Sequence, residues 1–178
     1  MKQEILVVGR GGQGVLLLGR ILGLAATKYA GLYAVVTESY SAETRGGESR
    51  SDIIIASSID EIEYNKVLNP NIAVFMFPFY VERYKATMIK PHTLIIVDED
   101  FVNPDFFKGY RVASAKFSGI AEKVTGTRRV ANMVILGKLL REIGVIGIEH
   151  VKAAISELVS PRWLDANFKA LEAGYNMA

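Results

Sequence analysis

Short apolar runs alternate with longer amphipathic stretches along this chain. The first run, residues 5–8, reads Ile-Leu-Val-Val and is typical of a strand buried on both faces of a sheet. Residues 13 to about 30 follow with apolar positions at helical spacing, and Gly31 stands where a helix end favours glycine. Two further strands are predicted at 33–37 and 52–57, and the polar loop between them predicts a long hairpin.

The second half of the chain continues this alternation. Strands are predicted at 72–77, 93–97 and 110–113, and helices at 80–89, 117–124, 130–143, 150–158 and 164–174. Residues 60–68 are polar and irregular and end at an Asn-Pro turn signal. Strands that alternate with helices predict an α/β fold, here a three-layer α/β/α sandwich on a mostly parallel, mixed sheet. The length of 178 residues predicts a single domain over 1–178.

The turn after the first strand, Gly9-Arg10-Gly11-Gly12-Gln13-Gly14, is the first candidate for chemistry. Glycines allow the backbone to turn sharply and approach a ligand, and a helix start offers unpaired N–H groups to an anion. The spacing Gly9-x-Gly11-x-x-Gly14 resembles a Rossmann-like dinucleotide turn, in which an acidic residue about 20 residues further on holds a ribose. Glu38 has that place. The opposing interpretation is a tight turn that binds nothing.

The hairpin loop is the second candidate. It places Arg45 and Arg50 on either side of the pair Gly46-Gly47. A guanidinium group offers several donors in a fixed fork and suits a phosphate. Two other interpretations stay open, namely an ion pair of Arg45 with a nearby glutamate and a plain turn at the two glycines. Gln13 is expected to hydrogen-bond either an amide or a neighbouring loop.

Several function classes find little support. Asp98-Glu99-Asp100 is a weak metal candidate, because side chains alternate across a strand, and capping of a turn by Asp100 is preferred. The two histidines lie in no motif, and no P-loop or nucleophile elbow is present. We therefore predict no catalytic residue and no metal ligand in this chain. The absence of cysteine excludes disulfides and Cys-ligated iron–sulfur clusters.

The charge and hydropathy patterns limit the kinds of partner that the chain is expected to have. The net charge is +2 and the basic residues are scattered, so nucleic acid is not an expected partner. No uncharged apolar run reaches the roughly 18 to 20 residues that a membrane span needs. No signal-peptide pattern is present, and a cytoplasmic protein is expected.

Two motifs together resemble those of a known family. GRGGQG at 9–14 and YSAETRGGES at 40–49 are similar to the forms G-x-G-G-Q-G-V and Y-G-x-E-x-R-G-G of the gamma subunits of 2-oxoacid:ferredoxin oxidoreductases. Ser41 stands where that family often has glycine. Two later motifs agree as well, Ala131-Asn132-Met133-Val134-x-Leu136-Gly137 and Asn167-x-x-Ala170-x-x-x-Gly174. The resemblance covers residues 2–175.

The resemblance implies a subunit of a larger enzyme. That enzyme oxidatively decarboxylates a 2-oxoacid with coenzyme A to acyl-CoA and carbon dioxide, and ferredoxin accepts the electrons. The short, unfused chain is more similar to the 2-oxoglutarate branch than to the pyruvate branch; the 2-oxoisovalerate and indolepyruvate branches stay open. In the family, the alpha and beta subunits hold thiamine diphosphate and Mg²⁺, and iron–sulfur clusters lie in the beta subunit or a ferredoxin-like delta subunit.

The resemblance also implies a role for the two loops. The gamma subunit packs against the alpha subunit and helps to close over coenzyme A, while the chain alone binds no cofactor and is inactive. The residues hypothesised to border the coenzyme A entrance are Gly9, Gly11, Gly12, Gln13, Gly14, Arg45, Gly46 and Gly47. The alternative is that both loops only pack on the alpha subunit. Without its partners, the chain is expected to expose an apolar patch or to form a homodimer.

Two other function classes stay open on the sequence. One is a stand-alone enzyme that uses the glycine turn to bind NAD or FAD. The other is a structural or regulatory module without a ligand.

Overall fold

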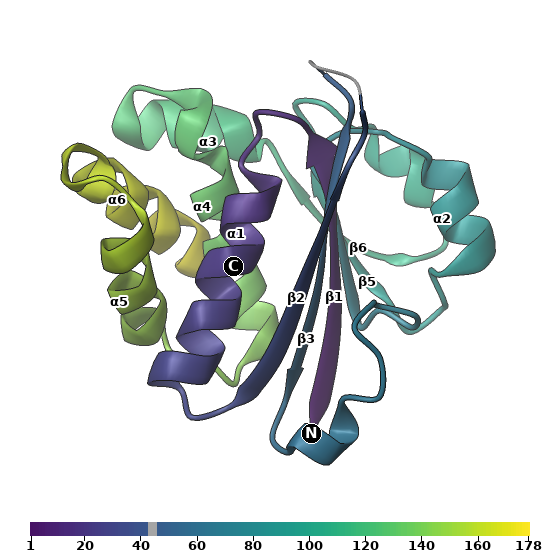
Figure 1. Cartoon of the computed structure of the whole chain (residues 1–178). Helices are drawn as coiled ribbons and strands as arrows, with labels where there is room; N and C mark the ends of the chain where they lie inside the picture. The colour runs from purple at the N-terminus through teal and green to yellow at the C-terminus, as the bar shows by residue number, and fades with distance from the viewer. Residues whose placement is uncertain (43–45) are drawn as a thin grey trace.

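The computed structural model describes residues 1–42 and 46–178. Its centre is a six-stranded mixed sheet in the order β2-β3-β1-β4-β5-β6. Helices cover both faces of this sheet, so the predicted three-layer α/β fold is confirmed (Figure 1). None of the described helices is long and apolar enough to cross a membrane.

The first three strands build the antiparallel part of the sheet. β1 (Lys2–Arg10) and β2 (Tyr33–Tyr40) both pair antiparallel with β3 (Glu48–Ala56), which lies between them. The predicted hairpin is therefore confirmed. Because β3 returns beside β1, the hairpin loop lies at the same edge of the sheet as the carboxyl end of β1, with Gly9 opposite Ser49.

The remaining strands are parallel. β4 (Ile72–Phe75), β5 (Leu94–Asp98) and β6 (Arg111–Ala115) follow β1 in that order, each parallel to its neighbour. All four carboxyl ends point to the edge that carries the hairpin loop. In an open α/β sheet this is the edge where ligands bind.

The helices divide unequally between the two faces of the sheet. α1 (Val15–Leu24) continues in a π-helical turn to Tyr29, and with α3, α4, α5 and α6 it covers one face (Figure 1). The last four span Phe117–Thr125, Ala131–Ile143, Ile148–Leu158 and Leu164–Tyr175. The other face carries α2 (Val81–Thr87) and a short 3-10 turn at Pro104–Phe107.

Alternate residues of β1 supply the cores on the two faces. Ile5 and Val7 pack with the five-helix face, whereas Leu6 and Val8 pack with α2. All four side chains are fully buried. The prediction of a strand buried on both faces is thus confirmed.

The two late sequence motifs bring α4 and α6 into close contact. A Cβ atom at Gly137 would overlap the backbone of Leu171, and one at Gly174 would overlap the backbone carbonyl of Val134. These two glycines therefore allow the helix backbones to touch. Their role in the described structure is packing within the five-helix face.

Candidate functional site

The two candidate loops meet at the carboxyl edge of the sheet. The amide of Gly11 donates a hydrogen bond of 2.9 Å to the carbonyl of Gly47, so the glycine turn and the hairpin loop are joined directly. The structure thereby brings together Gly9, Gly11, Gly12, Gln13 and Gly14 with Gly46 and Gly47. Arg45 lies outside the described residues.

An open cleft of about 770 Å³ lies between these loops. Its walls include the side chains of Arg10, Leu16, Tyr40 and Glu48 and the backbone of the glycines. The volume falls in the range of roughly 300–1,000 Å³ that pockets for small molecules and cofactors occupy.

Gln13 fixes the glycine turn from within. Its side-chain oxygen accepts a 2.7 Å hydrogen bond from the amide of Arg10, and its side-chain amide donates to the carbonyl of Met76 at 3.1 Å. The residue therefore ties the end of β1 to the end of β4. Of its two predicted partners, the neighbouring loop is the one observed.

Gly14 connects the first motif to the third. It has a φ of 76°, and a Cβ atom there would overlap the amide of Asn132, whose side chain donates a 3.2 Å hydrogen bond to the carbonyl of Gly14. Asn132 is buried. Replacing either residue would displace the start of α1 from the start of α4.

The surroundings of the turn differ from a Rossmann fold. The carboxylate of Glu38 accepts hydrogen bonds of 2.5 and 2.8 Å from Arg20, and β3 separates its strand from β1. The expected ribose role of Glu38 is therefore wrong for this geometry. The Rossmann-like character of the turn stays a prediction.

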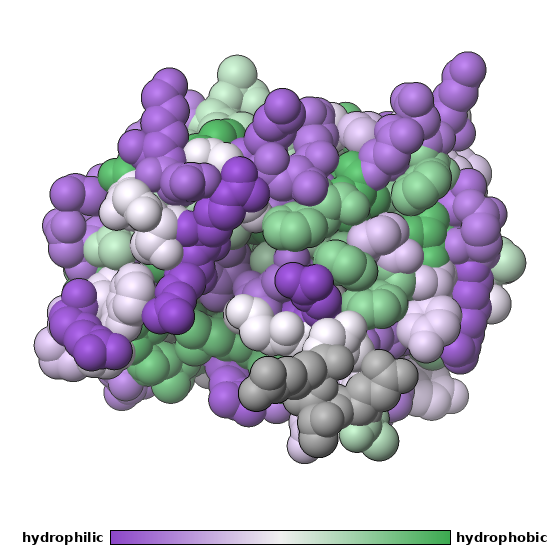
Figure 2. Space-filling model, turned by 90° about the horizontal axis from the view of Figure 1, so that it is seen from above, coloured by the Kyte–Doolittle hydropathy of each residue, from purple (hydrophilic) through white to green (hydrophobic). Residues whose placement is uncertain are grey.

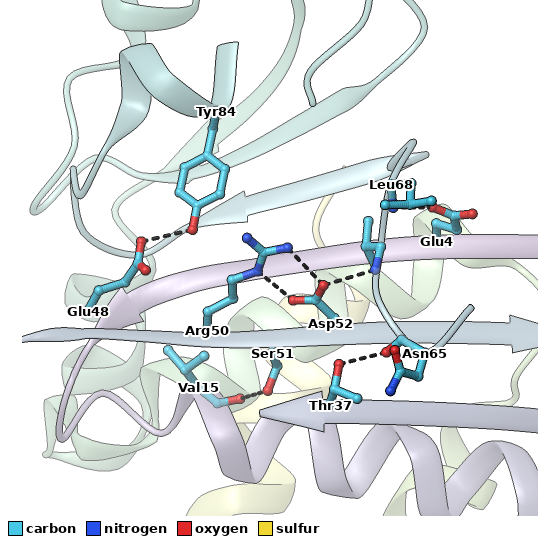
Figure 3. A network of polar contacts seen from close by, with 11 residues as sticks. Glu4, Val15, Thr37, Glu48, Arg50, Ser51, Asp52, Asn65, Leu68 and Tyr84 are labelled. Carbon is cyan, nitrogen blue, oxygen red and sulfur yellow. Dashed lines mark hydrogen bonds and ion pairs between the residues drawn. The ribbon is translucent and has the colours of Figure 1, made fainter. Parts of the chain in front are cut away.

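Arg50 does not face the cleft. Its guanidinium group donates hydrogen bonds of 2.5 and 2.8 Å to the buried carboxylate of Asp52 (Figure 3). Burial alone would lower the pKa of Arg50, but the hydrogen bonds and charge of Asp52 outweigh it and raise this pKa. The predicted phosphate role of Arg50 is wrong, because the side chain is committed to an ion pair inside the protein.

This ion pair belongs to a polar network that reaches the cleft. The hydroxyl of Tyr84 donates a 2.9 Å hydrogen bond to Glu48, and the Arg50 guanidinium carbon lies 5.5 Å from the Tyr84 ring centroid (Figure 3). Burial and the Glu48 carboxylate raise the pKa of Tyr84 to about 12. Since Glu48 lines the cleft, this hydrogen bond fixes the position of α2 relative to one wall of the cleft.

The acidic triplet has a structural role. Asp98 is buried and accepts hydrogen bonds from the Ser118 hydroxyl at 2.6 Å and the Asp100 amide at 3.1 Å, and burial raises the pKa of this carboxyl. Asp100 accepts a 2.7 Å hydrogen bond from the amide of Gly119 in the first turn of α3, so it caps a distant helix, whereas the side chain of Asp98 caps the turn that directly follows β5. Within residues 1–42 and 46–178, no three Asp, Glu, His or Cys side chains are arranged to hold a metal ion.

A second, smaller hollow lies on the other side of the glycine turn. It measures about 90 Å³ and is lined by Arg10, Arg128, Arg129 and Phe101, among others. Reasoning from the sequence missed this crevice. The available signal was the pair Arg128-Arg129, which Val130 separates from the Ala131-Asn132 motif.

Exposed and half-buried aromatic side chains gather beside these hollows. Phe77 lies 4.9 Å from Phe79 and 6.0 Å from Phe101, measured between ring centroids, and Phe79 lies 6.2 Å from Tyr80. Tyr80 is 56% exposed and has a left-handed backbone, with a φ of 52°. Figure 2 looks down on this edge and shows apolar side chains surrounded by hydrophilic ones.

Comparison with known proteins gives consistent results. The family model described as "Pyruvate ferredoxin/flavodoxin oxidoreductase" matches residues 4–177. The 2-oxoglutarate synthase subunit KorC of Methanothermobacter marburgensis is 39% identical over 182 residues, which cover 98% of this chain and 95% of the relative.

Two solved structures share the fold. The gamma subunit of a keto/oxoacid ferredoxin oxidoreductase from Geobacter sulfurreducens has a TM-score of 0.78 at 29% identity, over 97% of this chain and 96% of that chain. The 2-oxoglutarate:ferredoxin oxidoreductase of Magnetococcus marinus, solved with 2-oxoglutarate, coenzyme A and succinyl-CoA bound, has a TM-score of 0.84 at 23% identity. That match covers 98% of this chain and 30% of the other.

Proposed function

Because this chain belongs to the pyruvate ferredoxin/flavodoxin oxidoreductase family, we propose that it is the gamma subunit of a coenzyme A-dependent 2-oxoacid:ferredoxin oxidoreductase that acts on 2-oxoglutarate. The observation that carries this proposal is the hydrogen-bonded meeting of the glycine turn and the hairpin loop over a cleft of cofactor size. The similarity to KorC chains over nearly their whole length supports the choice of acid.

The chemistry of the reaction requires partner chains. The sequence contains no cysteine to hold an iron–sulfur cluster. In the proposed assembly the alpha and beta subunits supply thiamine diphosphate and Mg²⁺, and the clusters lie in the beta or a delta subunit. We further propose that the alpha subunit covers the exposed aromatic group of Phe77, Phe79, Tyr80 and Phe101, since an apolar patch beside a cofactor cleft is typical of an interaction surface.

The residues present fit coenzyme A. The amides of Arg10, Gly11 and Gln13 are already bonded within the loops, so they are not available to a ligand. Among the described residues no acceptor lies in hydrogen-bond range of the Gly12 and Gly14 amides, and the first turn of α1 adds further unpaired N–H groups. Together with the Arg10 side chain, these donors suit the diphosphate of coenzyme A. Arg45 is proposed to add a second cation from the hairpin loop.

The first experiment tests identity. A tagged copy is purified anaerobically from its native cell, its partners are identified by mass spectrometry, and reduction of a dye is measured with a panel of 2-oxoacids. We expect thiamine-diphosphate and iron–sulfur subunits to co-purify and activity to require both coenzyme A and 2-oxoglutarate. Preference for pyruvate, 2-oxoisovalerate or indolepyruvate would correct the acid but keep the family reaction. A chain without such partners, or one that binds NAD or FAD by itself, would overturn the proposal.

The second experiment tests the loops. Arg45→Ala in the assembled enzyme is expected to raise the KM for coenzyme A by about tenfold, because a charge-assisted contact to phosphate is lost. Arg83→Ala on exposed α2 is the matched control and should leave this KM unchanged. Unchanged kinetics of the Arg45 variant would show that the hairpin loop only packs on the alpha subunit.

A further inference from the structure

The smaller crevice lies where the chain changes sides of the sheet. After β1 the chain enters α1 on the five-helix face, and after β4 it enters α2 on the opposite face (Figure 1). The two strands are neighbours, so their carboxyl ends open a crevice at this switch point, the usual ligand position in open α/β sheets. The crevice is also lined by the starts of α3 and α4, through Ser118 and Ala131, and by Arg129 in the 3-10 turn before α4.

The crevice is rich in cations. The Arg10 guanidinium carbon lies 4.9 Å from the Phe77 ring centroid, and Arg128 pairs with Glu122 at 2.7 Å on the exposed surface. For Arg10 and Arg129, no carboxylate within the described parts of the chain lies at salt-bridge distance. Two cations thus face the crevice without an internal counter-charge.

The acidic groups nearby are already occupied. The Asp98 carboxylate is buried against the Ser118 hydroxyl, and the Asp100 carboxylate caps the Gly119 amide. Both carboxylates are hydrogen-bonded to the first turn of α3, and neither is among the residues that line the crevice. The arginines that line the crevice therefore suit an anionic ligand, because a charged acceptor strengthens their hydrogen bonds.

The size of the crevice selects the kind of anion. Its volume of about 90 Å³ is about three times the share of one water in the liquid. This is far below what a nucleotide needs, so the crevice has room for one terminal group. Arg10 and Gly12 line both this crevice and the large cleft, so one ligand can occupy the two from either side of the glycine turn.

Coenzyme A carries two kinds of phosphate. Its diphosphate is bonded into the chain at both ends, whereas its 3′-phosphate is a terminal monoester. Only the second can enter a small recess end-on. We propose that Arg129, assisted by Arg10, binds the 3′-phosphate of coenzyme A in the switch-point crevice, while the rest of the cofactor lies in the large cleft. This assignment rests on the proposed function and makes Arg129 the residue that distinguishes coenzyme A from 3′-dephospho-coenzyme A.

The test compares these two cofactors in the assembled enzyme. Arg129→Gln removes the charge and leaves a shorter polar side chain at this exposed position. It is expected to raise the KM for coenzyme A about tenfold, and to leave kcat and the KM for 3′-dephospho-coenzyme A within about twofold. Arg129→Lys keeps a point charge without the fork and should lie between the two. Arg10→Gln should raise both KM values, because Arg10 lines both hollows. Arg83→Gln is the matched control.

A binding measurement on the assembled enzyme gives an independent readout. Adenosine 3′,5′-bisphosphate is titrated by calorimetry, with adenosine 5′-monophosphate as the ligand that lacks the 3′ group. The wild-type enzyme should prefer the bisphosphate, and Arg129→Gln should remove the preference.

The contrary outcomes are distinct. Equal effects of Arg129→Gln on the KM values of both cofactors, or no effect on either, would overturn the assignment of Arg129. The proposed function would still stand if the activity of the wild-type enzyme depends on coenzyme A. Weaker subunit assembly with unchanged KM would show that the crevice holds an acidic side chain of a partner. A wild-type enzyme that needs no coenzyme A would overturn both proposals.

Discussion

The two faces of the sheet are stabilised in different ways. The five-helix face is closed by a large apolar core and by direct backbone contact between α4 and α6. The α2 face has a smaller apolar core, and a polar network of Arg50, Asp52, Glu48 and Tyr84 completes it. The difference shows how one sheet supports two layers of unequal size. Helices satisfy their own backbone groups and can be packed with apolar side chains alone, whereas loops over the α2 face need buried polar partners.

Asp52 illustrates the second case. Its carboxylate accepts hydrogen bonds from the Arg50 guanidinium group. It also accepts a 2.9 Å hydrogen bond from the amide of Val67 in the loop before β4. The carboxylate of Glu4 likewise accepts a 2.9 Å hydrogen bond from the amide of Leu68 (Figure 3). It also accepts one of 2.8 Å from the amide of Asn69. A loop that lies over the sheet is thus held by carboxylates from two strands.

The largest predicted effect breaks the five-helix face. Gly174→Ala places a methyl group against the Val134 carbonyl, and neither backbone can yield without separating α4 from α6. We expect a loss of about 4 kcal/mol or more in the free energy of unfolding, measured by urea denaturation. Gly147→Ala is the control, because its Cβ would meet its nearest atom at 3.6 Å. A loss below about 1 kcal/mol at Gly174 would contradict the close approach.

The next effect breaks the α2 face. Asp52→Asn keeps an acceptor for Val67 but leaves the Arg50 charge without its partner, at an expected cost of about 3 kcal/mol. Arg50→Gln and the double variant complete a thermodynamic cycle. The losses in the free energy of unfolding of the two single variants should sum to more than the loss in the double variant. Simple additivity would show that the pair does not act as a unit.

A smaller effect concerns the wall of the cleft. Tyr84→Phe removes the hydrogen bond to Glu48, at an expected cost of about 1 kcal/mol. The pKa of Tyr84 is about 12 in the folded protein, against 10.0 for an ordinary tyrosine in the unfolded chain. The stabilisation that comes from this difference is therefore complete below pH 10 and is lost as the pH rises through 12. Urea denaturation at pH 8 and pH 11 checks this. The wild-type chain should lose more stability over this interval than the variant does, and an equal loss would rule out Tyr84 as the source.

The smallest effect sharpens the comparison at the surface. Glu38→Gln breaks an exposed ion pair with Arg20, which salt screens and which contributes little to stability. The melting temperature should change less than in the Tyr84 variant, and the KM for coenzyme A should stay the same. A large rise in KM would return Glu38 to a ligand-binding role.

The sequence predicted the elements well because their signals are local. An apolar run bounded by glycine or proline specifies a strand wherever the strand finally lies, and helical spacing does the same for a helix. The Asp52 partner of Arg50 had a local signal too, since residues two apart in a strand share a face. The glutamate expected to hold a ribose was misassigned because that prediction assumed β2 beside β1.

The candidate site shows the same limit. Both loops were identified from their glycines, and the resemblance joined them in one hypothesis. Their direct contact, Gly11 to Gly47, depends on β3 inserting between β2 and β1. The switch-point crevice is lined by residues more than 100 positions apart in the chain, such as Arg10 and Arg129.

By itself, the sequence determined the order of strands and helices, the family, and the two glycine loops, because these follow from local periodicity and contiguous motifs. Only the tertiary structure decided which arginines face a hollow and which, like Arg20, pair with a carboxylate far along the chain. The reason is physical: the partner of a charge is chosen by the packing of the whole sheet, which brings together side chains whose separation along the chain carries no signal.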